Sequence, residues 1–237
     1  MKKLLIASTS NIYGSGYLEY IIPTLEDFFS NVSEIVFIPY ARPGGISYDA
    51  YTAIVREAFL KINKKVKGIH EFIDSEMAIQ NAEAIFTGGG NTFLLVHTIN
   101  EQKLFPTIKN AVENGTLYFG TSAGSNITGI NMKTTNDMPI VYPDSFDTLG
   151  LIPLNINPHY LDPDQNSKHK GETRETRINE FHIFNETPVL GLREGSWLEV
   201  IDDDIILKGS LPARLFRQGK KPLELMPECL VNTKIQN

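Results

Sequence analysis

Cysteine, long apolar runs and clusters of basic residues are scarce or missing in this 237-residue chain. Cys229 is the only cysteine, so an intramolecular disulfide is excluded, and we assign this residue a structural role. No apolar run approaches the roughly 20 residues that a helix needs to cross a bilayer. The apolar stretch Leu4–Ala7 is too short for a signal peptide. We therefore expect a cytoplasmic protein that makes no membrane contact.

The formal net charge of -6 is spread without any Lys/Arg-rich run. Nucleic-acid binding depends largely on neutralising phosphates, so this charge distribution argues against it and favours a small soluble partner. A hydrophobic content of 41% is enough for a substantial core. We expect one domain spanning residues 1–237, as a monomer or homodimer.

The first half of the chain alternates short apolar runs with segments of helical periodicity. The apolar runs are Leu4–Ala7, Ile35–Pro39, Ile69–Phe72, Ala84–Phe86 and Leu117–Phe119. The helical segments are Tyr17–Phe29, Tyr51–Ile62, Thr92–Ile99 and Phe105–Val112. Strands that alternate with helices predict an α/β fold with a parallel sheet, in which binding chemistry gathers at the carboxyl ends of the strands.

Beyond Pro188 the pattern changes to short strands separated by close turns. The strand-like segments are Val189–Leu192, Trp197–Ile201, Ile205–Leu207 and Ala213–Phe216. Such close spacing predicts antiparallel hairpins added to the sheet.

Gly120-Thr121-Ser122-Ala123-Gly124 follows the apolar run Leu117–Phe119 and precedes a plausible helix. A serine held on so tight a strand-to-helix turn needs neighbours with almost no side chain, which the two glycines supply. The pattern fits an exposed nucleophilic serine, and it also fits an ordinary tight turn. Its partners must decide between the two.

A serine hydroxyl needs a base, and histidine is the usual one because it titrates near neutrality. Among five histidines, His159 is the best candidate, because it follows Pro158 at the end of the apolar run Leu151–Ile156. Pro158 has a fixed backbone angle, so we expect the imidazole to be held in a rigid loop at a strand end.

Two carboxylates could orient that imidazole. Glu194 follows the strand Val189–Leu192 and precedes Gly195, and Asp137 lies in the loop region after the serine turn. A turn-capping role is the alternative for each. The order serine, histidine, glutamate differs from that of α/β-hydrolases, but such triads are recognised by geometry.

The glycine loop Gly88–Gly90 lies between the strand Ala84–Phe86 and the helix that starts near Thr92. Its unhindered backbone N–H groups could stabilise an oxyanion or bind a phosphate. Phosphate binding is weakened because the loop has neither the P-loop lysine nor the G-x-G-x-x-G spacing.

Arg174 and Arg177 lie three residues apart in a helix for which Thr173 is a reasonable N-cap. Surface ion pairs are the common role of such arginines. In a hydrolase site they could hold a substrate carboxylate through bidentate hydrogen bonds.

Taken together, several motifs resemble the peptidase E family, the α-aspartyl dipeptidases. They are Gly88–Phe93, Gly120–Gly124, Thr134–Val141, Asn157–His159 and His169–Arg174, in the same order along nearly the whole chain. The resemblance implies a three-layer α/β sandwich similar to class I glutamine amidotransferases, with a mostly parallel central sheet and serine in place of their cysteine.

The resemblance also implies roles for individual residues. Ser122 would be the nucleophile and His159 the base, with Glu194 or Asp137 as the acidic member, of which we favour Glu194. Gly89, Gly90 and the amide of Ala123 would form the oxyanion hole. Substrate contacts would come from Asn91, Arg174 and Arg177, with Arg174 binding the side-chain carboxylate of an N-terminal aspartate. Thr121 and Arg193 depart from the enterobacterial members, which carry tryptophan and proline there.

These inferences predict a serine exopeptidase that cleaves Asp-X dipeptides and needs neither cofactor nor metal. The nearest alternative is a cyanophycinase-like hydrolase of aspartate-rich polymers. A non-catalytic protein that binds a small ligand at the Gly88–Gly90 loop is an alternative from another class. A metallohydrolase built from His159, Asp162 and Asp164 is a remote third.

Overall fold

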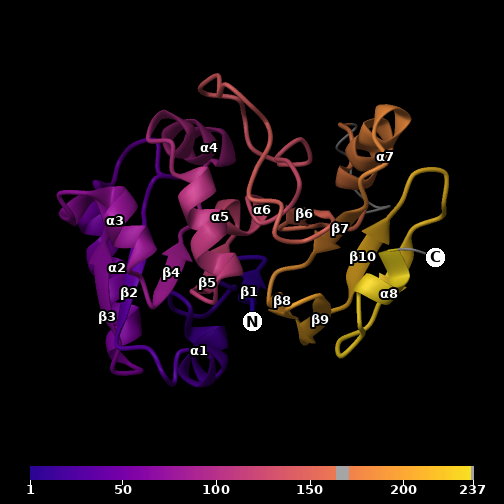
Figure 1. The fold of residues 1–237 in the computed structure, drawn as a ribbon. Helices are drawn as coiled ribbons and strands as arrows, with labels where there is room; N and C mark the ends of the chain where they lie inside the picture. The colour runs from indigo at the N-terminus through magenta and orange to yellow at the C-terminus, as the bar shows by residue number, and fades with distance from the viewer. Residues whose placement is uncertain (164–170, 236–237) are drawn as a thin grey trace.

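A seven-stranded sheet forms the centre of the protein in the computed structural model, which describes residues 1–163 and 171–235 (Figure 1). The strand order is β3-β2-β4-β5-β1-β8-β9, in which the first five are parallel and β8 and β9 are antiparallel. The strands are β1 (Lys3–Ala7), β2 (Glu34–Ile38), β3 (Lys65–Gly68), β4 (Ala84–Thr87), β5 (Leu117–Thr121), β8 (Ser196–Ile201) and β9 (Asp204–Gly209). The predicted α/β fold with a mostly parallel sheet is confirmed.

Helices cover both faces of this sheet because its central strands are apolar on both sides. In β1, Leu4 and Ile6 belong to one buried cluster, whereas Leu5 and Ala7 belong to another on the opposite face. The first cluster packs against α3 (Ser75–Gln80), α4 (Thr92–Glu101), α5 (Phe105–Glu113) and α6 (Ala123–Asn126). The second packs against α1 (Ile22–Phe28) and α2 (Tyr48–Leu60). Helices on the two faces give the sandwich its three layers.

A separate four-stranded sheet, in the order β11-β10-β7-β6, lies beside the large one (Figure 1). Its strands are β6 (Asn155–Pro158), β7 (Val189–Leu192), β10 (Ala213–Phe216) and β11 (Leu223–Leu225). The predicted hairpin β8–β9 does join the large sheet, but β7 and β10 do not, so that part of the sequence prediction is wrong. The reason is pairing: β7 runs parallel to β6 and antiparallel to β10. The remaining helices are α7 (Arg174–Phe184) and α8 (Asn232–Ile235).

The sequence prediction also misplaces β3, the strand at one edge of the large sheet. The apolar run Ile69–Phe72 predicts it, but the strand is Lys65–Gly68, and Ile69–Glu71 forms a turn of 3-10 helix. At the sheet edge only alternate residues need burial, so Lys65 and Lys67 are tolerated. The Glu71 carboxylate accepts a hydrogen bond from the Gly68 N–H at 2.6 Å, which stabilises the turn.

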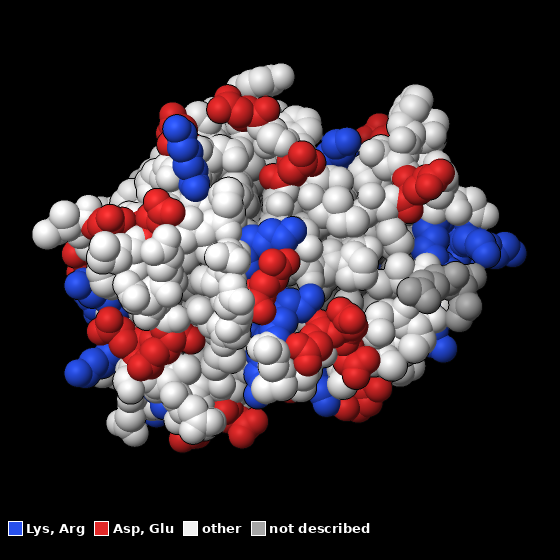
Figure 2. All heavy atoms as spheres, viewed as in Figure 1, with Lys and Arg blue, Asp and Glu red and all other residues white. Residues whose placement is uncertain are grey.

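Within the described residues no helix has the length and apolarity that crossing a membrane requires. On the face shown in Figure 2, acidic and basic side chains lie interspersed among neutral ones.

Candidate active site

Ser122 lies at the junction between β5 and α6 with φ 51° and ψ −110°, a conformation that L-residues rarely adopt. Crowding explains the glycines on either side. A Cβ on Gly120 would lie 2.5 Å from the Gly124 carbonyl oxygen, and one on Gly124 would lie 2.1 Å from that of Thr87. The predicted strand–turn–helix around the serine is therefore present, and its glycines are required by space.

His159 joins Ser122 to Glu194 across the gap between the two sheets. Its Nε2 lies 2.9 Å from Ser122 Oγ, and its Nδ1 lies 2.6 Å from Glu194 Oε1. A carboxylate can only accept, so Nδ1 carries the proton and Nε2 is left to accept from the serine hydroxyl. The His159 and Glu194 side chains are 34% and 48% exposed, so substrate and water can reach the pair.

The backbone around His159 is held by residues that the sequence reading did not single out. His159 has φ 53°, and its N–H donates to Ser8 Oγ at 2.9 Å. The buried Ser8 hydroxyl in turn donates to the Leu192 carbonyl at 2.7 Å, two residues before Glu194. Ser8 directly follows the apolar run Leu4–Ala7, so its place at a strand end was the signal that could have identified it.

Asp137 has a different set of contacts. Its Oδ2 accepts from the Thr92 N–H at 2.7 Å and from the Thr135 hydroxyl at 3.0 Å, at the start of α4. Asn91 caps the same helix by accepting from the Leu94 N–H, and its amide donates to the Met138 carbonyl. Of the two carboxylates that the sequence left open, Glu194 contacts the imidazole and Asp137 stabilises the helix next to the glycine loop.

The glycine loop packs directly on the serine. A Cβ on Gly89 would lie 3.0 Å from Ser122 Cβ, and Gly90 has φ 147° with its Cβ position 2.2 Å from the Ala41 carbonyl oxygen. Across residues 1–163 and 171–235, the N–H groups of Gly89, Gly90 and Ala123 donate no hydrogen bond. They therefore remain available to an oxyanion.

The two arginines of α7 have different surroundings. Arg174 is half-buried and has no ion pair within the part of the chain described here, whereas Arg177 is 60% exposed and pairs with Glu172 at 3.8 Å. Burial lowers the pKa of Arg174 and Arg177 lowers it further, while Asp137 and Glu194 raise it. Within the described chain Arg174 is therefore a half-buried cation without an ion-pair partner, and the charges of Asp137 and Glu194 act on its pKa.

The metal alternative has little support among the described residues. Asp162 forms hydrogen bonds with Arg193 at 2.7 and 2.9 Å, and Asp164 lies outside the described residues. No three His, Cys, Asp or Glu side chains of residues 1–163 and 171–235 are grouped so as to hold a metal ion.

Proteins in which a histidine links a strand-end serine to a carboxylate on an α/β scaffold are serine hydrolases, and the fold and site place this chain in that class. Comparison with known proteins narrows the class. The profile of peptidase family S51 matches residues 4–208. The chain belongs to this family, and it is a serine-type peptidase.

Two curated relatives and one solved structure illustrate the similarity. Peptidase E of Streptomyces coelicolor is 48% identical over 222 residues, which cover 94% of this chain and 90% of that protein. A Drosophila melanogaster protein named "Probable alpha-aspartyl dipeptidase" is 46% identical over 229 residues, with coverage of 95% and 94%. The crystal structure of a peptidase from an acI-B1 actinobacterium, 15% identical, shares the fold with a TM-score of 0.70 over 96% of this chain and 95% of that one.

Proposed function

We propose that this protein is a dipeptidase that hydrolyses the peptide bond after an N-terminal aspartate in Asp-X dipeptides. The names of its relatives support the reaction, and Arg174 supports the substrate. This half-buried guanidinium lies near Asp137 and Glu194 with no ion pair of its own in the described chain. An aspartate side chain supplies the carboxylate that such an arginine binds through two parallel hydrogen bonds.

In the proposed reaction, Ser122 Oγ attacks the carbonyl carbon of the aspartyl residue and His159 Nε2 takes the serine proton. Glu194 stabilises the resulting imidazolium through the Nδ1 hydrogen bond. His159 then gives its proton to the leaving amine, and the peptide C–N bond breaks. Water then attacks the acyl-enzyme with His159 again as base. The ester C–O bond to Ser122 breaks, His159 returns the proton to Ser122 Oγ, and aspartate is released.

The developing oxyanion would be stabilised by the N–H groups of Gly89, Gly90 and Ala123. Asp137 supports this group indirectly, because its contact with the Thr92 N–H fixes the first turn of α4 next to the loop. We assign Asn91 the same supporting role, since both ends of its amide are occupied by Leu94 and Met138. We further propose that both sheets belong to a single domain and that the protein acts in the cytoplasm.

Replacing Arg174 tests the substrate assignment. Arg174→Met should lower kcat/KM for Asp-Leu by at least about 100-fold, because the buried substrate carboxylate would lose its charged partner. Turnover of Asn-Leu should change little, so the preference for aspartate should collapse. Because Arg177 is exposed and pairs with Glu172, we assign it no substrate contact, although the sequence suggests one. Arg177→Met is therefore the matched control and should retain the preference.

Replacing Ser122 tests the reaction itself. Ser122→Ala should abolish Asp-Leu hydrolysis and fluorophosphonate labelling while the circular dichroism spectrum stays unchanged. Turnover that persists in Ser122→Ala would refute the nucleophile, and an Arg174→Met variant that still prefers Asp-Leu would refute the recognition of aspartate.

A further inference from the structure

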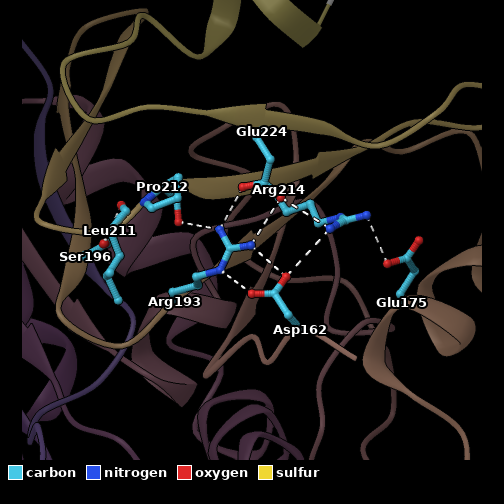
Figure 3. Close-up of polar contacts among 8 residues, drawn as sticks. All are labelled: Asp162, Glu175, Arg193, Ser196, Leu211, Pro212, Arg214 and Glu224. Atoms are coloured by element: carbon cyan, nitrogen blue, oxygen red, sulfur yellow. Dashed lines mark hydrogen bonds and ion pairs between the residues drawn. The ribbon is translucent and has the colours of Figure 1, made fainter. Parts of the chain in front are cut away.

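Arg193, the residue directly before Glu194, is an arginine with every guanidinium nitrogen engaged (Figure 3). Its side chain is only 13% exposed. Nε and Nη2 donate to the two carboxylate oxygens of Asp162 at 2.9 and 2.7 Å. Nη1 and Nη2 donate to Glu224 at 2.9 and 3.1 Å, and Nη1 also donates to the Pro212 carbonyl at 2.7 Å. Such a planar fork of donors cannot be reproduced by lysine.

These contacts join the chain segments that carry His159 and Glu194. Asp162 lies three residues after His159, and Glu194 is the next residue after Arg193. The arginine therefore links the loop after β6 to the end of β7, and it anchors both to β11 through Glu224. A shift of this side chain would move His159 and Glu194 relative to each other.

Tyr160 fills the space between these segments. The Arg193 guanidinium carbon lies 5.5 Å from the centre of the Tyr160 ring, and the Tyr160 N–H donates to the Leu192 carbonyl at 3.1 Å. A Cβ on Gly191 would lie 2.5 Å from the same ring, so the packing leaves no room for a larger residue. His159 lies directly before this tyrosine and has an unfavourable positive φ, which only a rigid surrounding can maintain.

Asp162 also extends the network toward Arg174. Arg214 lies 3.6 Å from Asp162 and 3.4 Å from Glu224, and its Nη2 lies 3.2 Å from Glu175 (Figure 3). Glu175 follows Arg174 in the first turn of α7. The network therefore reaches both the histidine–glutamate pair and the helix that carries the substrate-binding cation.

We infer that Arg193 and Arg214 are positioning residues with separate tasks. Arg193 holds His159 and Glu194 in hydrogen-bonding geometry, and Arg214 holds the start of α7 so that Arg174 faces the substrate. This assignment rests on the proposed Asp-X dipeptidase activity. It predicts that the two arginines affect different kinetic constants, although they share Asp162 and Glu224.

The kinetic test compares Arg193→Lys with Arg214→Lys, both of which keep the charge and lose the fork. Arg193→Lys should lower kcat for Asp-Leu about 10- to 100-fold with little change in KM, because misplaced catalytic groups cost rate in the transition state. Arg214→Lys should raise KM several-fold with little change in kcat. Arg56 lies on α2 beside the edge strand β3 and pairs with Glu71. Arg56→Lys, which likewise keeps the charge and loses the fork, is the matched control and should change neither constant.

A spectroscopic test does not depend on turnover. The short bond between His159 Nδ1 and Glu194 should give a far-downfield proton resonance, absent in His159→Gln. In Arg193→Lys this resonance should broaden or vanish, whereas it should persist in Arg56→Lys and Arg214→Lys. An Arg193→Lys protein that keeps both the resonance and the wild-type kcat would overturn the inference, as would a loss of kcat with the resonance intact.

Failure of the dipeptidase proposal itself would look different. In that case the wild type would not hydrolyse Asp-Leu at all, while the resonance would still report whether Arg193 positions the pair. Equal losses of kcat in Arg193→Lys and Arg214→Lys, with KM unchanged in both, would refute the division of tasks.

Discussion

Replacing Glu194 by glutamine should lower kcat for Asp-Leu by about 10- to 10⁴-fold. The lower bound follows from losing a charge-assisted hydrogen bond, about 1.5–3 kcal/mol, at roughly 1.4 kcal/mol per tenfold change in rate. The upper bound is the effect of about 10⁴ seen when a triad carboxylate becomes an amide, which can hold the wrong histidine tautomer. Because Glu194 is 48% exposed, water partly screens its charge, and we expect a value below the upper bound.

The position of the imidazole proton decides how large the loss is. A glutamine amide that donates to Nδ1 would place the imidazole proton on Nε2, where it faces Ser122 Oγ at 2.9 Å and cannot accept the serine proton. Asp137→Asn is the comparison. Its amide oxygen can still accept from the Thr92 N–H, so only the charge at the helix N-terminus is lost, worth about 0.3–1 kcal/mol. We therefore expect kcat of Asp137→Asn to fall less than tenfold.

Steady-state release of leucine from saturating Asp-Leu measures both variants, with folded protein quantified by circular dichroism. An Asp137→Asn variant that loses more activity than Glu194→Gln would refute the assignment of Glu194 to the imidazole. A Glu194→Gln variant that retains more than about a tenth of the wild-type kcat would refute it too, because loss of the charge-assisted hydrogen bond alone accounts for a decrease of about tenfold.

Two further predictions concern the scaffold of the site. Gly90→Ala should lower the free energy of unfolding by about 2–4 kcal/mol in urea titrations, because its Cβ would lie 2.2 Å from the Ala41 carbonyl oxygen at a strained φ. Gly44→Ala, where a Cβ meets nothing within 4 Å, should change stability by less than about 0.5 kcal/mol, and equal losses in both variants would contradict the crowding argument. Ser8→Ala leaves the His159 N–H and the Leu192 carbonyl without their shared partner, so we expect a loss of about 1–3 kcal/mol together with a lower kcat. An unchanged kcat in Ser8→Ala would show that this hydroxyl does not hold the histidine.

The features that depend on residues close together in the chain could be predicted from the sequence. The crowding of Gly120 against the Gly124 carbonyl arises within one turn of five residues, and the positions of His159 and Glu194 follow from polar residues at strand ends. Alternation of strands and helices likewise predicts the parallel sheet, because each element carries its own apolar pattern.

Contacts between distant segments could not be predicted from the sequence. The choice between Glu194 and Asp137 depends on how two sheets meet, and both residues look alike as loop carboxylates. Nothing in the spacing of Arg174 and Arg177 shows that one pairs with Glu172 and the other stays unpaired within the described chain. The edge strand β3 was misplaced because a strand with one covered face needs only alternate apolar residues.

The Ser122–His159–Glu194 contact joins side chains from the two sheets. Ser122 follows β5 of the large sheet, whereas His159 and Glu194 follow β6 and β7 of the small one. Ser8, which follows β1 of the large sheet, bonds across to His159 and Leu192 on the small-sheet side. Peptidase activity therefore depends on the relative position of the two sheets. A mild denaturant that loosens the contact between them should abolish activity, while the backbone hydrogen bonds within each sheet still keep its strands paired.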